Sequence, residues 1–215
     1  MTGTEIITQF ELQVDDVTEL STSEELSVLN RVCRKIYNNR SWEFLKKEAT
    51  GSIAQDATSY YITLPTVFAY FCENYKYTDN SIGVQGTSSP TVVFVGTDYN
   101  PYKVVNFSDR KQYRDSAGYV YLDLAGSKIR FTGSPTFANG STYSFDYIYV
   151  PDAITAGTSP VFPARFHDLV VYGMAVDNDI IQKSPKAKAY TAENQMKYNG
   201  VMEDMMWWNA NLQMN

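Results

Sequence analysis

The spacing of hydrophobic and polar positions changes twice along this chain. Over residues 22–40 apolar side chains recur every three or four positions, which predicts an amphipathic helix. Thr22 and Glu25 have the capping-box spacing, so this helix is expected to begin at Thr22. Over residues 46–149 the spacing shortens to two, which predicts β-strands. The helical spacing returns over residues 163–212.

The central region is expected to hold several short strands separated by turns. The expected strands are residues 60–64, 67–77, 92–95, 104–107, 119–122, 128–131 and 143–149. Between them we expect a turn at residues 100–101 and a short helix over residues 108–114. The pair Asn139-Gly140 is a favoured hairpin turn.

The two ends of the chain carry the remaining elements. Residues 1–20 are acidic and mildly apolar and are expected to form an arm or a short strand. Residues 41–45 are expected to add a short turn with two aromatic rings. A Pro-initiated helix is expected over residues 163–180, and a last helix over residues 185–212 after the break at Ser184-Pro185.

These elements predict an α+β fold. Residues 1–50 and 160–215 are expected to form one discontinuous helical bundle, and residues 51–159 an inserted, antiparallel β-rich domain. The length of 215 residues is sufficient for one large core or for two subdomains.

Composition narrows the function. The chain contains 17 tyrosines, which suit β-strands but are also enriched at protein–protein interfaces, so both interpretations remain open. The net charge is −6, and no stripe of basic residues is present, which argues against tight binding to nucleic acid through phosphate contacts. No segment has the length and hydrophobicity of a membrane span or a signal peptide, so we expect no membrane partner and synthesis in the cytoplasm.

Residues that could carry catalysis are scarce. His167 is the only histidine, and its place in the first turns of a helix favours a packed imidazole over a catalytic base. Cys33 and Cys72 lack metal-site spacing and are expected to be buried free thiols. No phosphate-binding loop occurs. We therefore expect no enzymatic activity, no metal and no cofactor.

The last helix holds the candidate interface. Seven positions of this helix follow each other at spacings of three and four, which is typical of a bundle core or a coiled-coil seam. Adjacent residues on a helix point about 100° apart, so Trp207 and Trp208 are not expected to enter one core together. One of them is expected to meet a second subdomain or a second subunit. The candidate interface residues are Tyr190, Tyr198, Met205, Met206, Trp207 and Trp208.

The order of these features resembles that of the head–tail adaptor proteins of tailed bacteriophages, and is similar to the tail tubular protein A family of short-tailed phages. A first helix is followed by an aromatic segment over residues 37–45, and a strand ends at Leu64-Pro65. Residues 127–150 contain an I-x-F-x-x-x-P run and a Y-x-F-x-Y run. Phe162-Pro163 then leads into the C-terminal helices.

This resemblance implies a structural protein of the virion neck. It implies a homo-oligomeric ring, usually of twelve copies, that binds the portal protein on one side and the tail or a second adaptor on the other. Double-stranded DNA would pass non-specifically through its centre. The alternative is a tail-associated module that binds carbohydrate or a receptor, with Tyr and Trp rings stacking on sugars.

Overall fold

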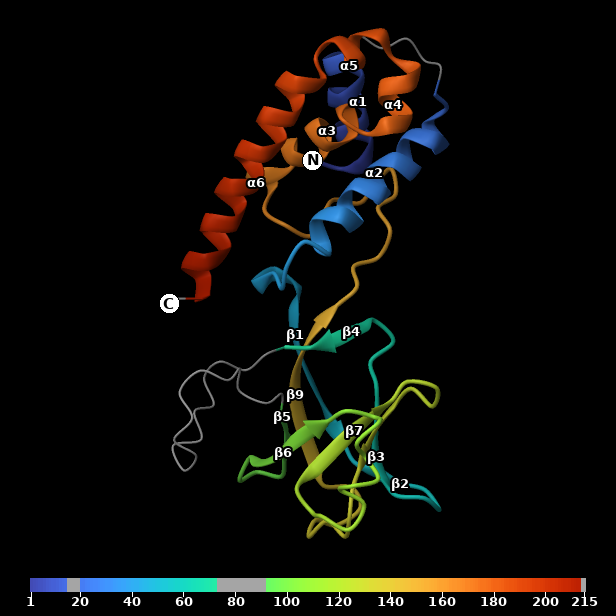
Figure 1. Ribbon diagram of the computed structural model, residues 1–215, viewed down its shortest axis with the longest axis vertical. Coiled ribbons are helices and arrows are strands. Elements are labelled where there is room, and N and C mark those ends of the chain that lie inside the picture. Colours follow the sequence, from blue (N-terminus) through green and yellow to red (C-terminus); the bar gives the residue numbers. More distant parts are fainter. Residues whose placement is uncertain (15–19, 73–91, 214–215) are drawn as a thin grey trace. The chain divides into compact units, whose positions relative to one another are not determined.

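The chain has a mixed α/β fold. The computed structural model describes residues 1–14, 20–72 and 92–213, and these residues form six α-helices and one nine-stranded sheet (Figure 1). They divide into two compact units. The helical unit is Met1–Leu45 with Pro151–Asn215, and the β unit is Lys46–Val150.

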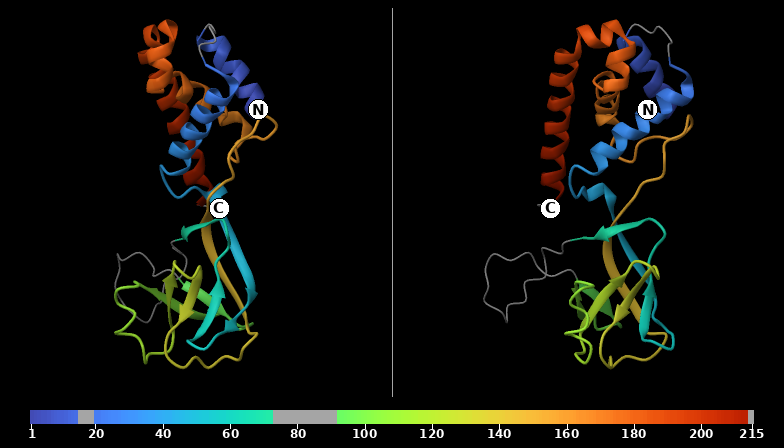
Figure 2. Two further views of the ribbon diagram at one scale, coloured as in Figure 1. Left: turned by 90° about the vertical axis from the view of Figure 1, so that its right-hand side faces the viewer. Right: turned by 45° about the vertical axis from the view of Figure 1, so that its right-hand side comes forward.

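The helices of the helical unit pack around α3. Their bounds are α1 (Gly3–Val14), α2 (Thr22–Tyr37), α3 (Asp168–Ala175), α4 (Asn178–Lys183), α5 (Pro185–Ala189) and α6 (Thr191–Gln213), with short 3₁₀ turns η1 (Glu43–Leu45) and η2 (Ala164–Phe166). Helix α3 contacts α1, α2 and α6, and the two views of Figure 2 show it beside α6. The buried side chains Phe10, Leu29, Leu169 and Met205 belong to these four helices. Sequence segments from both chain ends therefore share one core.

Helix α1 corrects the expectation of an arm or a strand at the N-terminus. Ile6, Ile7, Phe10 and Val14 are all buried, and their spacing places them on one side of a helix. The acidic and polar residues between them face solvent. The stripe is short, and the sequence analysis gave more weight to composition than to this spacing.

Helix α2 begins with a capping box one residue earlier than expected. Ser21, rather than Thr22, is the N-cap, and the Ser21 hydroxyl accepts a hydrogen bond from the backbone N–H of Glu24. The Glu24 carboxylate accepts hydrogen bonds from the Ser21 backbone N–H at 2.8 Å and from its hydroxyl at 2.9 Å. These bonds, with Lys183 beside the carboxylate, lower the pKa of Glu24 to about 2.

The C-terminal helices are divided more finely than the sequence predicts. The region 163–180 contains η2, α3 and the start of α4, because Asp177 caps α4 by accepting from the Asp179 backbone N–H. The last helix is two helices, since the chain leaves helical geometry at Tyr190 with φ −103° and ψ 14°. The expectation of one continuous helix over 185–212 is therefore wrong at that residue.

The β unit is built on one sheet. The strands are β1 (Lys46–Ser52), β2 (Ala54–Gln55), β3 (Tyr60–Thr63), β4 (Phe68–Phe71), β5 (Val92–Val95), β6 (Asn100–Val105), β7 (Tyr119–Asp123), β8 (Lys128–Phe131) and β9 (Thr142–Tyr149). Their order is β1-β9-β5-β6-β7-β8-β3-β2, and β4 also pairs with β9. Of the strand expected over 67–77, the part from residue 73 lies outside the described residues.

Four local expectations for this unit are wrong. Strands β6 and β7 pair in parallel, whereas an antiparallel domain was expected; the segment 106–118 is long enough to carry the chain back for parallel pairing. That segment consists of turns where a short helix was expected, and residues 100–101 belong to β6. Asn139-Gly140 forms a turn, but it joins β8 to β9, which do not pair with each other.

The chain enters and leaves the β unit on neighbouring strands. Strand β1 pairs antiparallel with β9, and Lys46, the first residue of the unit, lies opposite Ile148. Strand β9 also pairs with β5 and β4, so it has three partner strands. Its inward side chains Phe145 and Tyr147 belong to the buried core of the unit, together with Ile62, Val120 and Ile129.

Candidate interface on the C-terminal helix

Tyr198 and Met205, from the middle of α6, pack within the helical unit itself. Met205 is fully buried. Tyr198 is half-buried, and its ring covers Gly173 of α3. A Cβ on Gly173 would lie 2.5 Å from Val32 Cγ1 and 3.0 Å from Tyr198 Cε2, so the glycine permits close approach of α2, α3 and α6. Burial raises the pKa of the Tyr198 hydroxyl.

Trp208 belongs to an aromatic group within the helical unit. Its ring centroid lies 5.5 Å from that of Phe166 and 6.4 Å from that of Phe44. The Arg165 guanidinium lies 5.2 Å from the centroid of the indole, within cation–π range. Phe44 also stacks on the fully buried Trp42 at 5.4 Å. Trp208 therefore packs within its own helical unit.

Trp207 points the other way and is 72% exposed. Met196, eleven positions earlier on α6, is 69% exposed, and Gly200 between them has open space beside it. Glu203 and Asp204 lie one turn before Trp207 and are exposed. We call Met196, Gly200 and Trp207 the outer stripe of α6, since their spacing places them on one side of the helix.

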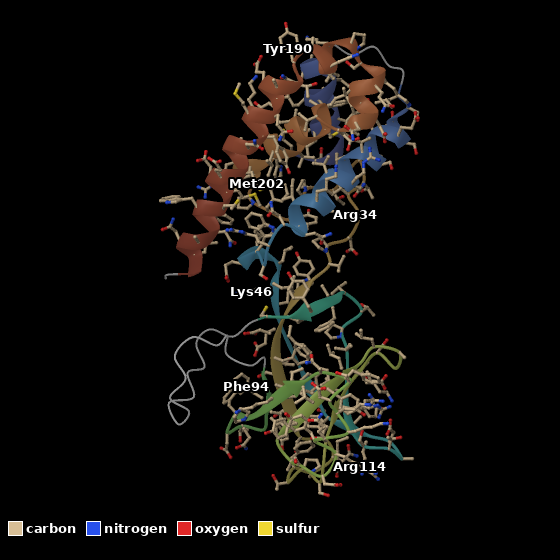
Figure 3. The ribbon with its side chains drawn as sticks, in the orientation of Figure 1. Arg34, Lys46, Phe94, Arg114, Tyr190 and Met202 are labelled. Atoms are coloured by element: carbon tan, nitrogen blue, oxygen red, sulfur yellow. The ribbon has the colours of Figure 1, made fainter. Side chains whose placement is uncertain are left out.

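The other two candidates are Tyr190 and Met206. Tyr190 is 49% exposed at the junction of α5 and α6, and Met206 is half-buried. Figure 3 labels Tyr190 and, further along α6, the buried Met202. The six candidates therefore do not form one surface of the helical unit: some lie in its core and others face solvent.

Two buried asparagines of α6 hold the helix to other segments. The Asn194 side-chain oxygen accepts a hydrogen bond from Gln13 Nε2 of α1 at 3.0 Å. The Asn209 side-chain oxygen accepts from the Glu43 backbone N–H at 2.8 Å. Asn194 is one of the seven regularly spaced positions of the last helix, but its bond to Gln13 was not predicted. The buried Asn209 and the exposed Met196 were not predicted either. A polar residue inside an apolar stripe was the available signal for the asparagines.

The side chains of the histidine and the two cysteines are buried in the protein. His167 is buried, with Nε2 3.0 Å from the Phe162 carbonyl oxygen and Nδ1 next to the Met1 amino group. Burial lowers the pKa of its imidazole. Cys33 and Cys72 are buried and form no disulfide, as predicted, and burial raises the pKa of Cys33 to about 12. Among the described residues no His, Cys, Asp and Glu side chains gather as a metal site.

Charged side chains stabilise the junction between α3 and α4. The Asp177 carboxylate is nearly buried and accepts a hydrogen bond from Arg31 Nε at 3.1 Å. Burial alone would raise the pKa of Asp177, but the bonds from Arg31 and from the Asp179 backbone outweigh it, and the pKa is lowered. Arg31 also pairs with Asp179 at 2.7 Å. These groups pair with one another and join α2 to the junction of α3 and α4.

The described residues form a mixed α/β protein whose last helix exposes Met196 and Trp207. A family model, the SU10 adaptor protein, matches residues 1–212. The chain therefore belongs to the SU10 adaptor protein family, a family of phage adaptor proteins, which implies a structural role at the virion neck. No curated protein matches the chain. The finer resemblance to tail tubular protein A stays a prediction.

No helix in the described part of the chain has the length and apolarity that crossing a membrane requires.

Proposed function

We propose that the protein is one subunit of a homo-oligomeric ring that connects the portal to the tail or to a second adaptor. The ring has about twelve copies, and double-stranded DNA passes through its centre without being held. Membership of the adaptor family supports this proposal, and the net charge of −6 suits a lumen that does not retain DNA.

The exposed Trp207 is the observation that carries the proposal. A tryptophan buries a large apolar area when covered, and Trp is enriched at the energetic centres of protein interfaces. Trp207 has most of its surface exposed in the single chain, and Met196, eleven positions earlier on the same side of α6, is exposed as well. In a closed ring each subunit would cover this stripe with a different surface of its neighbour.

The candidates that pack inward have a separate role. Met205 is buried, and the half-buried Tyr198 and Trp208 pack against other segments of the helical unit. The half-buried Met206 and the more exposed Trp207 and Tyr190 remain for contact with a neighbouring subunit or the portal. Repetition of a modest contact around the ring would give multivalent stability.

The test is size-exclusion chromatography with light scattering on the full chain, alone and mixed with the portal of the same phage. The wild-type protein is expected to form a ring, alone or on the portal, and Trp207→Ala is expected to weaken that assembly while the variant stays folded. Leu12→Ala is the matched control, because Leu12 is an apolar residue of α1 that is 69% exposed and outside the candidate interface. Equal assembly by wild type and Trp207→Ala would remove the role of the outer stripe, and a chain that never binds the portal would overturn the adaptor ring.

A further inference from the structure

A pocket of about 680 Å³ opens in the β unit, and none of its lining residues belongs to the candidate interface. One wall comes from the chain between β2 and β3, including Thr58 and Ser59. A second comes from β7 and the chain after β8, including Tyr121 and Ser134. The turn segment 107–115 contributes three cations to the lining: Arg110, Lys111 and Arg114.

The turn segment that carries these cations is held in place at both ends. The Arg110 guanidinium lies 3.6 Å from the centroid of the Phe107 ring and donates a hydrogen bond to the Phe107 carbonyl oxygen. The Arg114 carbonyl oxygen accepts from the Gly133 backbone N–H at 2.9 Å. Gly133 has φ +61°, and a Cβ there would lie 2.8 Å from the Ser116 carbonyl carbon, so this contact requires glycine. The backbone of the turn segment and the Arg110 guanidinium are therefore held in place.

The acidic groups nearest the pocket are already neutralised. Asp56 accepts hydrogen bonds from the Thr58 and Ser59 backbone N–H groups and pairs with Lys128 at 3.0 Å and Arg130 at 3.1 Å. The backbone bonds, followed by the bond from Lys128, lower the pKa of Asp56. Asp123 pairs with Arg130 at 2.8 Å. The charges of Asp56, Asp123, Lys128 and Arg130 are therefore paired with one another.

The pocket cations have no such partners. Among the described residues, no carboxylate lies within ion-pair distance of Arg110, Lys111 or Arg114, and the lining residues include no Asp or Glu. Asp109, in the same turn segment, accepts from Asn106 and Ser108 and does not line the pocket. Asp115 follows Arg114 but is also absent from the lining. A chain with net charge −6 thus presents a concave surface lined by unpaired cations.

We propose that this pocket binds a carboxylate-rich peptide segment of a partner protein. Guanidinium groups bind carboxylates through paired charge-assisted hydrogen bonds, and clusters of Arg recognise acidic motifs. The hydroxyl groups of Thr58, Ser59 and Ser134 can form hydrogen bonds with the peptide backbone. An extended peptide fits a pocket of this volume, whereas a rigid DNA duplex presents its phosphates on a convex surface.

Arg114 is the residue to test, because its side chain is exposed and lines the pocket (Figure 3). Fluorescence anisotropy of a labelled oligoglutamate peptide with the full chain, at low ionic strength, measures the binding. Arg114→Gln is expected to weaken binding about tenfold, the effect of losing one charge-assisted contact. Lys188→Gln, which removes one exposed positive charge from the helical unit, is the matched control and is expected to leave binding within about twofold.

Two further probes decide the class of ligand. A neutral oligosaccharide and a DNA duplex, each carrying the same fluorescent label as the peptide, are titrated with the full chain. Both are expected to bind more weakly than the peptide. Equal loss of peptide binding in Arg114→Gln and Lys188→Gln overturns the site, and stronger binding of the saccharide or the duplex overturns the peptide as its ligand. The inference goes beyond the adaptor ring, since it concerns residues outside the candidate interface and peptide binding is measured separately from ring assembly on the portal.

Discussion

Two glycines of the helical unit provide a sharp test of how its helices pack. Gly173 of α3 and Gly200 of α6 both lie inside helices, where Ala is favoured over Gly by about 1 kcal/mol. A Cβ at Gly200 meets nothing within 4 Å, so Gly200→Ala is expected to stabilise the chain by about 0.5–1 kcal/mol. The same substitution at Gly173 places a methyl group 2.5 Å from Val32 Cγ1 and 3.0 Å from Tyr198 Cε2.

Overpacking of a core costs about 1–3 kcal/mol, and the higher helix propensity of Ala offsets about 1 kcal/mol of this cost. Gly173→Ala is therefore expected to lower the free energy of unfolding by about 1 kcal/mol. Val32→Ala removes the atom that clashes. In that background Gly173→Ala is expected to cost less, with a coupling free energy of about 1–2 kcal/mol between the two positions.

The assay is urea unfolding followed by circular dichroism of the helices, on the four members of the Val32–Gly173 cycle and on Gly200→Ala. Additive effects at the two positions, or equal stabilisation by Gly173→Ala and Gly200→Ala, would show that α2 and α3 do not approach each other as described.

Three other substitutions test particular contacts. Gly133→Ala forces a side chain onto φ +61° and against the neighbouring backbone, and is expected to destabilise the β unit by about 2 kcal/mol in thermal unfolding monitored by near-ultraviolet circular dichroism. Trp42→Ala removes a fully buried indole and its 2.7 Å hydrogen bond, and is expected to cost about 3–5 kcal/mol, while Trp42→Phe is expected to cost less. The pKa of Glu24 is about 2 in the folded chain against 4.5 for the free side chain, so its stabilising effect is complete above pH 4.5 and is lost as the pH falls towards 2. Urea midpoints of Glu24→Gln should therefore fall less than those of the wild type over that range, and parallel curves would contradict the capping box.

The spacing of apolar residues predicted the elements whose burial follows a regular pattern. Strand β9 alternates between Tyr143 and Tyr147, and α2 carries a clear apolar stripe, so both were found close to their observed bounds. Helix α1 was missed because its stripe consists of only a few residues in an acidic segment. Helix ends were less predictable, since Ser21-Glu24 and Thr22-Glu25 both have the capping-box spacing and the chain uses the first pair.

The site was predicted in part for the same reason. Adjacent tryptophans point to different sides of any helix, and the structure indeed places Trp208 on Phe44 and leaves Trp207 exposed. The sequence could not indicate which of the two would be covered, because that depends on residues 44 and 166, which are distant along the chain. The pocket of the β unit was not predicted at all. Its cations lie in a turn segment, and only the parallel pairing of β6 and β7 fixes where that segment runs.

The pairing of Lys46 with Ile148 has a practical consequence. The first and last strands of the β unit lie side by side, so Leu45 and Pro151 are attached to neighbouring points of the sheet. Residues 46–150 can therefore be removed or exchanged without a long linker between Leu45 and Pro151. Related phages could thus acquire a different β unit at this position by recombination, while the helical unit stays unchanged. A chimaera that carries a foreign domain between Leu45 and Pro151 should fold as readily as the parent.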